Sequence, residues 1–264
     1  MKNIIWTFWN DGYIPPIVRK CLQSIHRHSQ GFSVITLREK DLPQEIYKIF
    51  GGKYKLRLAL NDGLEGTYAQ HISDIVRIWA LKEFGGIWID ISTYCNAPLN
   101  IPLNGDSEFY AEYAQHLTPE GFHETNLPFF LTCLMASEKN GEIVSKWLDE
   151  CAFVWTFDHL REYTEYITKQ GVNLDGINHR ESYLWPCLAL RNVLIKNPEL
   201  VDKIETRCCD FPGGYFNLSY ECGWDGNKMK QLYNKDKHPL IKLTNPDRDK
   251  HSTLELVCAA EEER

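Results

Sequence analysis

The chain has 264 residues, of which 43% are apolar and 12% aromatic, as is typical of a folded domain with a substantial core. Its 29 Lys and Arg residues against 36 Asp and Glu give a formal charge of −7. This balance argues against a general nucleic-acid-binding protein, because such affinity depends on basic residues that replace the counterions of the phosphates. We expect one large α/β domain over residues 1–264 and no nucleic-acid partner.

Membrane insertion and secretion are also disfavoured. No apolar run approaches the roughly 20 residues that span a bilayer, and the N-terminus lacks the apolar core and cleavage site of a signal peptide. The nine cysteines are scattered without a CxxC pair, as in proteins whose thiols stay reduced. We therefore expect a cytoplasmic protein.

Hydrophobic patterns in the first hundred residues predict strands that alternate with helices. We expect a strand at 4–9, a helix opened by Pro15 and Pro16, a strand at 32–37, a short helix at 42–50, a less regular stretch around 51–63, a helix at 68–84 and a strand at 87–91. This alternation predicts a largely parallel sheet with helices on both faces, which forms a nucleotide-binding half over residues 1–100.

Residues 101–264 have a mixed pattern. We expect strands at 108–113 and 129–136, and helices at 141–157 and 182–195. These elements are predicted to extend the sheet and to build a second wall of the same domain.

Residues 73–92 carry the most informative pattern. Asp74 and Arg77 stand three residues apart on an expected helix, so they share a face and can form one bidentate polar unit. The helix leads through Gly85 and Gly86 to a strand that ends at Asp90. From the residues alone, the pair can be an exposed salt bridge and Asp90 a loop cap. Alternatively they form a ligand site, since open α/β sheets bind ligands beyond the carboxyl ends of their strands.

Asp90 is the first acceptor group at the point where this strand leaves the apolar core. A carboxylate in that position suits a hard divalent cation such as Mn²⁺ or Mg²⁺, which binds few protein oxygens and completes its shell with phosphate oxygens and water.

The Asp-x-x-Arg pair followed by Phe-Gly-Gly-Ile-Trp-Ile-Asp at 84–90 resembles the sugar-binding region of the capsular polysaccharide synthesis family of retaining GT-A glycosyltransferases, which carries a D-x-D motif. The resemblance is close over the first 100 residues and holds in outline over the rest. It implies a GT-A fold, that is, a Rossmann-like mixed sheet with helices on both faces.

The resemblance also implies roles for individual residues. Asp74, Arg77 and Asp90 would be the catalytic residues, with Asp74 and Arg77 on hydroxyls of the donor sugar. The first strand would lie beside the nucleotide base, and residues 239–244 would be a C-terminal lysine loop that closes over the diphosphate. The remaining implied contacts to the nucleotide sugar are Thr7, Phe8, Trp9, Gly85, Gly86, Trp88, His238 and Lys242.

Asn126 and Ser92 are two further candidate ligand-binding positions. Asn126 precedes an apolar run and can hydrogen-bond the donor sugar, although a turn asparagine is the better explanation from the residues alone. Ser92 stands where D-x-D has its second acid, so Asp90 and Ser92 are the expected metal ligands. Because a hydroxyl is a weaker ligand than a carboxylate, the sequence leaves open whether a metal is required.

The expected function is transfer of a hexose from a nucleotide sugar, a UDP-hexose, to a polysaccharide repeat unit with retention of the anomeric configuration. The expected acceptor is linked to a lipid diphosphate at the inner face of the membrane. Residues 228–250, with seven Lys and Arg against three Asp, are most simply a solvated face, and their functional interpretation is a surface for anionic lipids or diphosphates. The alternative is a non-catalytic nucleotide-sugar-binding protein, for which Ser92 argues. An oxidoreductase and a kinase are disfavoured, because the chain has neither G-x-G-x-x-G after its first strand nor a P-loop.

Overall fold

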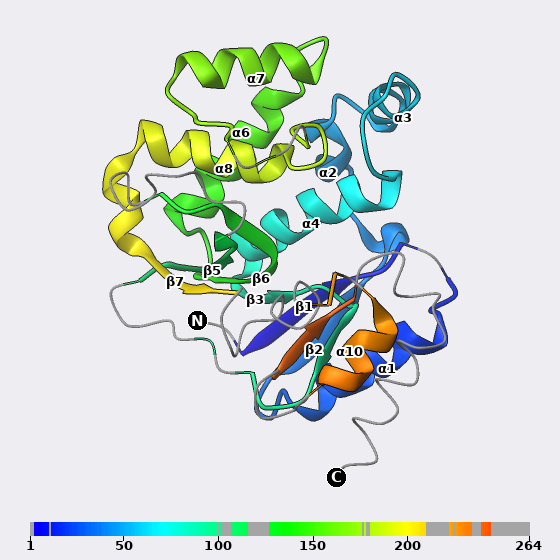
Figure 1. The fold of residues 1–264 in the computed structure, drawn as a ribbon. Helices are drawn as coiled ribbons and strands as arrows, with labels where there is room; N and C mark the ends of the chain where they lie inside the picture. The colour runs from blue at the N-terminus through cyan, green and yellow to red at the C-terminus, as the bar shows by residue number, and fades with distance from the viewer. Residues whose placement is uncertain are drawn as a thin grey trace.

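The computed structural model describes residues 3–10, 12–99, 101, 107–115, 127–175, 177, 180–209, 222–223, 225–233 and 239–243 (Figure 1). Its helices are α1 Pro16–Arg27, α2 Gln44–Ile49, α3 Lys53–Asn61, α4 Tyr68–Phe84, α6 Glu142–Val154, α7 Leu160–Lys169, α8 Trp185–Lys196 and α10 Gly226–Leu232, with 3₁₀ turns at Glu39–Asp41 and Pro198–Lys203. Its strands are β1 Ile4–Phe8, β2 Ser33–Leu37, β3 Gly86–Ile89, β4 Thr93–Cys95, β5 Phe109–Tyr113, β6 Phe130–Ser137, β7 Ile204–Cys208 and β8 Leu240–Lys242.

Within the described part of the chain, six strands form one mixed sheet in the order β2-β1-β3-β6-β5-β7. β1 pairs in parallel with both β2 and β3, whereas β6 runs antiparallel to both β3 and β5. The carboxyl ends of β1, β2 and β3 therefore meet at one edge of the sheet. The predicted change from a parallel first half to a mixed second half is confirmed.

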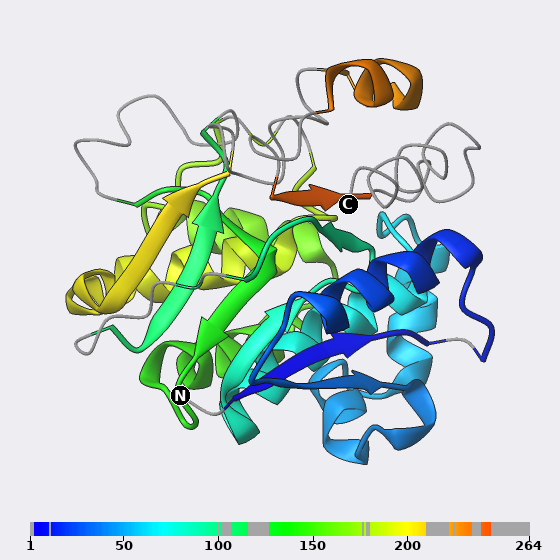
Figure 2. The ribbon, with the colours of Figure 1, turned by 90° about the horizontal axis from the view of Figure 1, so that it is seen from below.

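Helices cover both faces of this sheet, as the sequence predicts. α4, α6 and α8 lie on one face and α1 lies on the other (Figures 1 and 2). The main core lies between the sheet and the first group of helices, and its largest fully buried side chains include Trp88, Trp147 and Trp185. The fold is the mixed α/β architecture expected from the alternation of elements.

A two-stranded sheet of β4 and β8 lies beside the main sheet. It packs with α1 and α10 around a second apolar cluster that contains Val18, Tyr94, Met229 and Ile241. Through this cluster the C-terminal strand β8 is held next to the chain that leaves β3. No helix in the described ranges is long and apolar enough to cross a bilayer.

The structure differs from the sequence-based expectation in several elements, and β4, α7, β7 and α10 were not predicted at all. The stretch expected to be irregular contains α3, and α8 begins at Trp185 rather than at 182. The segment expected to be a lysine loop contains the strand β8, which pairs antiparallel with β4. For β8, the pairing with β4 decides a conformation that the local sequence leaves open.

Helix α4 begins and ends at residues whose chemistry fixes the boundaries. The Thr67 side chain accepts from the Gln70 backbone N–H at 3.3 Å, and the Gln70 side chain accepts from the Thr67 backbone N–H at 2.7 Å, which forms a capping box. At the other end Gly85 adopts φ +69° and turns the chain directly into β3.

Gly86 is required by the close approach of β1 and β3. It has φ +107°, and a Cβ atom there would lie 2.5 Å from the carbonyl oxygen of Ile4. Gly86→Ala is expected to lower the free energy of unfolding by about 3 kcal/mol, measured by urea denaturation, because it adds a clash with backbone to an unfavourable φ.

Gly63→Ala is the matched control for this prediction. Gly63 has φ +99° but nothing lies within 4 Å of the added Cβ, so only the backbone strain applies. We expect a loss of about 1 kcal/mol there. Equal losses at the two positions would contradict the proposed clash.

Candidate active site

The site is built around Arg77, which α4 carries into the interior. Its Nη2 lies 3.1 Å from Asp74 Oδ1 and 3.5 Å from Asp90 Oδ1, and its Nη1 donates to the Thr132 carbonyl oxygen at 2.7 Å and to the Thr132 hydroxyl. The side chain is 8% exposed, so the pair with Asp74 is not the exposed salt bridge that spacing alone allowed. Nor is it bidentate, because one guanidinium nitrogen bridges two carboxylates.

Asp90 lies directly after β3 and is held by three donors. Lys242 Nζ lies 2.8 Å from Oδ2, whereas Trp88 Nε1 lies 3.0 Å from Oδ1 and shares that oxygen with Arg77. The Arg77 guanidinium also lies 5.4 Å from the centre of the Trp88 ring. Trp88 is fully buried, so it holds Asp90 and Arg77 in place from the core side rather than facing a ligand.

Lys242 reaches the site from β8. Thr93 is in register with Lys242, and the Leu243 N–H donates to the Ser92 carbonyl oxygen at 2.9 Å. This pairing directs the ammonium to Ser92 Oγ at 2.8 Å as well as to Asp90. The lysine predicted to lie on a closing loop is therefore fixed by a strand pair and is 10% exposed.

The two carboxylates have opposite electrostatic environments. Burial raises the pKa of Asp74 to about 7, with the charge of Asp90 adding to the rise and Arg77 opposing it. Burial also favours a higher pKa for Asp90, but the charges of Lys242 and Arg77 outweigh it and lower the pKa of Asp90 to about 2. Burial disfavours the charge of Arg77, and Asp90 and Asp74 more than offset this, so its pKa is raised. Asp90 is the permanent anion of the site and Asp74 the one that titrates.

Asp74→Asn is expected to stabilise the protein at pH 8 by about 2 kcal/mol, measured by urea denaturation. The pKa of Asp74 is about 7 in the folded protein, above its ordinary 3.8. Between these two pH values the folded state therefore binds more protons than the unfolded state. The contribution of Asp74 to stability therefore falls as pH rises from about 4 to 7, and asparagine removes this loss.

The wild-type and Asp74→Asn unfolding free energies should differ most above pH 7 and converge near pH 4. Asp149→Asn, at an exposed position of α6, is the matched control and should change neither value. A destabilised Asp74→Asn protein at pH 8 would contradict this account of the carboxylate.

The other predicted contacts lie in two places. In the pairing of β1 with β3, Trp6 lies opposite Trp88. Two residues farther along the chain from each, Phe8 therefore lies at the level of Asp90. Thr7 and Phe8 are buried in the core, with the Thr7 hydroxyl donating to that of Thr36 at 3.0 Å, and only Trp9 is partly exposed. Trp9 Nε1 donates to the Tyr13 carbonyl oxygen at 2.8 Å, which fixes its ring at the end of β1.

Gly85 and Gly86 are not brought together with Asp90. Gly86 stands at the opposite end of β3, four residues from Asp90 or about 13 Å at the rise of a strand, and Gly85 lies one residue farther away. Their environment accounts for them without a ligand, because the Gly85 carbonyl oxygen accepts from Trp6 Nε1 at 2.9 Å and a Cβ there would lie 2.7 Å from the backbone nitrogen of Lys139. Asn126 and His238 lie outside the described residues.

The implied divalent cation does not fit the described residues. Its expected ligands are Asp90 Oδ2 and Ser92 Oγ, and Lys242 Nζ lies 2.8 Å from each of them. Metal–oxygen distances of about 2.0–2.6 Å leave no room for a second cation between the same two atoms. In the ranges that the structure describes, no three His, Cys, Asp or Glu side chains are grouped as a metal site.

Two further residues, His71 and Thr132, support the site and were not predicted from the sequence. His71 is buried in α4, where its Nε2 donates to the Glu65 carbonyl oxygen at 2.8 Å and its Nδ1 accepts from Trp185 Nε1 at 3.1 Å. Burial lowers the pKa of His71 to about 4, so the ring is neutral. Thr132 supplies two acceptors to Arg77 from β6. No local motif marks either residue, since Trp185 lies 114 positions from His71 and Arg77 lies 55 positions from Thr132.

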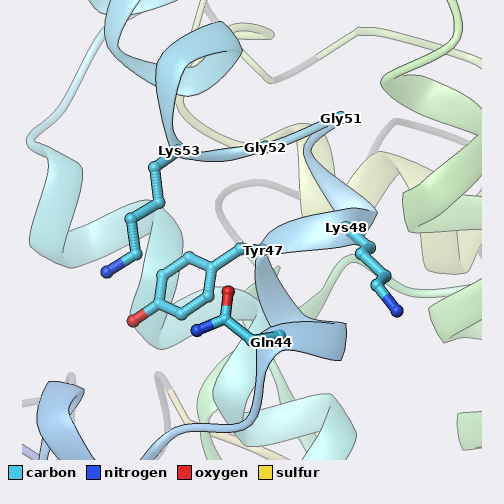
Figure 3. A pocket seen from close by; sticks show the side chains of 6 residues that line it. All are labelled: Gln44, Tyr47, Lys48, Gly51, Gly52 and Lys53. Carbon is cyan, nitrogen blue, oxygen red and sulfur yellow. The ribbon is translucent and has the colours of Figure 1, made fainter.

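A separate hollow of about 410 Å³ lies between α2 and α3 and is lined by Gln44, Tyr47, Lys48, Gly51, Gly52 and Lys53 (Figure 3). Lys53 Nζ lies 4.0 Å from the centre of the Tyr47 ring and 3.3 Å from Glu39 Oε1. None of the predicted site residues lines this hollow.

Comparison with known proteins gives one family. The model of the family described as capsular polysaccharide synthesis protein matches residues 1–161. No curated protein was found to match the chain in sequence.

Solved structures with a similar chain course include three glycosyltransferases. The PaToxG glycosyltransferase gives a TM-score of 0.45 at 15% identity, over 98% of this chain and 87% of that one. A glycosyltransferase involved in glycosylation of the major capsid of PBCV-1 gives 0.44 at 13% identity, over 94% and 98%. The glycosyltransferase GlyE of Streptococcus pneumoniae TIGR4 gives 0.46 at 15% identity, over 99% of this chain and 62% of that one.

The family match, rather than these structural likenesses, carries the assignment. It covers the first-strand segment, α4, β3 and Asp90, on which most of the resemblance rested, whereas residues 239–244 lie outside the matched range. The chain belongs to the capsular polysaccharide synthesis family, the family of glycosyltransferases that its Asp74–Asp90 segment resembles.

Proposed function

We propose that the chain transfers a hexose from a UDP-sugar to the saccharide of a polysaccharide repeat unit, with retention of the anomeric configuration. The observation that carries the proposal is the connected cluster of Asp74, Arg77, Asp90 and Lys242 beyond the carboxyl end of β3. Its two carboxylates are 16% and 18% exposed, so the cluster is supported from the core and remains open to a ligand.

The charges of this cluster suit the reaction. The bond between the anomeric carbon and the β-phosphate oxygen breaks, its electron pair stays with the nucleoside diphosphate, and the acceptor hydroxyl oxygen forms the new bond. The net products are the glycoside, UDP and the proton of that hydroxyl. Negative charge grows on the leaving diphosphate, and a fixed cation beside it lowers the barrier.

Individual roles follow from position and charge. Lys242 is the cation for the diphosphate, and Asp90 with Ser92 fixes it. Asp74 accepts hydrogen bonds from hydroxyls of the donor sugar, and Arg77 orients both carboxylates. Trp9, partly exposed at the end of β1, provides a face on which the nucleotide base can stack.

The proposed acceptor is carried on a lipid diphosphate at the inner face of the membrane. Residues 228–250 contain seven Lys and Arg against three Asp, and such a basic stretch attracts anionic headgroups and diphosphates. The protein is then a peripheral partner of the cytoplasmic membrane surface.

Calorimetry and UDP release with the purified chain test the function. We expect one of the common UDP-hexoses or UDP-N-acetylhexosamines to bind and to be hydrolysed slowly without acceptor, whereas Lys48→Met, whose side chain is 76% exposed, behaves as wild type. Failure of every UDP-sugar to bind or to release UDP above background would contradict the proposal.

A non-catalytic nucleotide-sugar-binding protein is the second candidate, favoured by Ser92 in place of the second acid of D-x-D. The same assays separate the two. Tight binding of a UDP-sugar with no turnover, alone or with lipid-linked saccharide, would favour the binding protein.

A further inference from the structure

The ammonium of Lys242 occupies the place where a cation bound by the D-x-D positions would lie. Its Nζ is 2.8 Å from Asp90 Oδ2 and 2.8 Å from Ser92 Oγ, which are the oxygen atoms that these two positions offer. A metal held by the same atoms would need this space, and the lysine would have to leave first.

The backbone holds Lys242 there, so its position does not depend on a flexible loop. β8 pairs with β4 over Thr93–Lys242, Tyr94–Ile241 and Cys95–Leu240. Ile241 and Leu243, on either side of the lysine, are fully buried in the second apolar cluster. Withdrawal of the ammonium would require the aliphatic chain to leave a position that is 10% exposed.

The charges of the cluster are already balanced. When Asp74 is ionised, two carboxylates, Asp74 and Asp90, face two cations, Arg77 and Lys242. A divalent ion would add two positive charges to this set, and the hydroxyl of Ser92 contributes no compensating negative charge. Buried ionic groups are stable only where their charges are compensated, so a metal is disfavoured while both basic residues are present.

We propose that Lys242 replaces the divalent metal, so that the transferase binds its donor and stabilises the leaving diphosphate without Mn²⁺ or Mg²⁺. This inference rests on the proposed function. It assigns the charge stabilisation of the bond-breaking step to a side chain of this chain, and it accounts for Ser92, because a hydroxyl is a good acceptor for an ammonium and a poor ligand for a dication.

Two measurements test this inference without changing Lys242. In the first, Mn²⁺ is titrated into the protein with and without UDP and followed by electron paramagnetic resonance. We expect the wild type to show no bound Mn²⁺ that is lost in the Asp90→Asn variant, that is, no Mn²⁺ site that depends on Asp90. In the second, UDP-sugar binding and UDP release are measured in EDTA and in Mn²⁺, and we expect values within about twofold, because the charge is supplied by the protein.

Variants of Lys242 sharpen the test. Lys242→Met is expected to lower donor affinity in EDTA by about tenfold or more. Added Mn²⁺ should recover part of the loss, because the substitution removes the ammonium from the space between Asp90 and Ser92. Lys242→Arg keeps the charge and should retain more affinity in EDTA than Lys242→Met. Lys48→Met is the matched control on an exposed lysine and should not change.

The outcomes separate the inference from the function on which it rests. If donor binding requires Mn²⁺, or if the wild type binds one Mn²⁺ through Asp90, the inference that Lys242 replaces the metal is overturned. The proposed glycosyltransferase function is not affected by that result. Absence of donor binding in both EDTA and Mn²⁺ overturns the proposed function, and the inference falls with it.

Discussion

Replacing Arg77 by Met is expected to lower the free energy of unfolding by about 3 to 5 kcal/mol and to abolish donor binding. Arg77 is the cation between Asp74 and Asp90, and both carboxylates lie in a largely buried site. Methionine fills a similar volume but leaves the two acids without the guanidinium and leaves the Thr132 carbonyl oxygen without its 2.7 Å donor. Urea denaturation at pH 8, where Asp74 is ionised, measures the full effect.

Arg191→Met is the matched control for this variant. Arg191 is also buried in a helix, but its Nε and Nη1 have no hydrogen-bond partner among the described residues, and burial lowers its pKa. Removing this guanidinium is expected to change the free energy of unfolding little or to raise it. A loss at Arg191 as large as that at Arg77 would show that volume, and not the bridge between two carboxylates, sets the cost.

Asp90→Asn is expected to reduce UDP release by about 100-fold to 1,000-fold, as is typical when a group that fixes the charge-stabilising element is lost. The variant keeps the shape of the side chain but removes the charge that holds Lys242 and Arg77. Turnover is measured with the UDP-sugar that the wild type hydrolyses fastest, and Asp149→Asn on the exposed face of α6 is the control. Unchanged turnover in Asp90→Asn would contradict the assigned site.

The stability of Asp90→Asn has a pH dependence of its own. The pKa of Asp90 is lowered to about 2 from its ordinary 3.8, so its ion pairs stabilise the wild type above pH 4 and the contribution is lost as pH falls towards 2. The wild type should therefore be more stable than the variant at pH 7 by about 2 kcal/mol, and the difference should vanish near pH 2. A difference that stays constant from pH 7 to pH 2 would contradict the depressed pKa.

The elements around the site could be predicted because their local signals agree. α4 combines apolar positions at helical spacing with a terminal glycine, and the strand that follows is continuously apolar up to Asp90. α3 shows the reverse situation. Its residues Tyr54, Leu56, Leu58 and Leu60 alternate as in a strand, yet they form a helix in which only Leu56 is buried. Period-two spacing does not indicate a strand there, because two of these four residues, Tyr54 and Leu58, are exposed rather than facing the core.

The geometry of the site depends on contacts between residues far apart in the chain. Lys242 could be singled out from the sequence, but its bond to Ser92 joins residues 150 positions apart and requires the β4–β8 pair. The same holds for His71, whose partner Trp185 lies 114 positions away. Asp74, Arg77 and Asp90 could be placed together because one helix and one strand in direct succession carry all three.

A crystal structure of the wild-type protein with UDP and Mn²⁺ is the most direct test of the central claim, that the cluster beyond β3 binds the donor nucleotide. The account predicts the base against Trp9, the diphosphate beside Lys242, and Lys242 still on Asp90 and Ser92. Binding of UDP in the hollow between α2 and α3, or at any place away from Asp90, would contradict it.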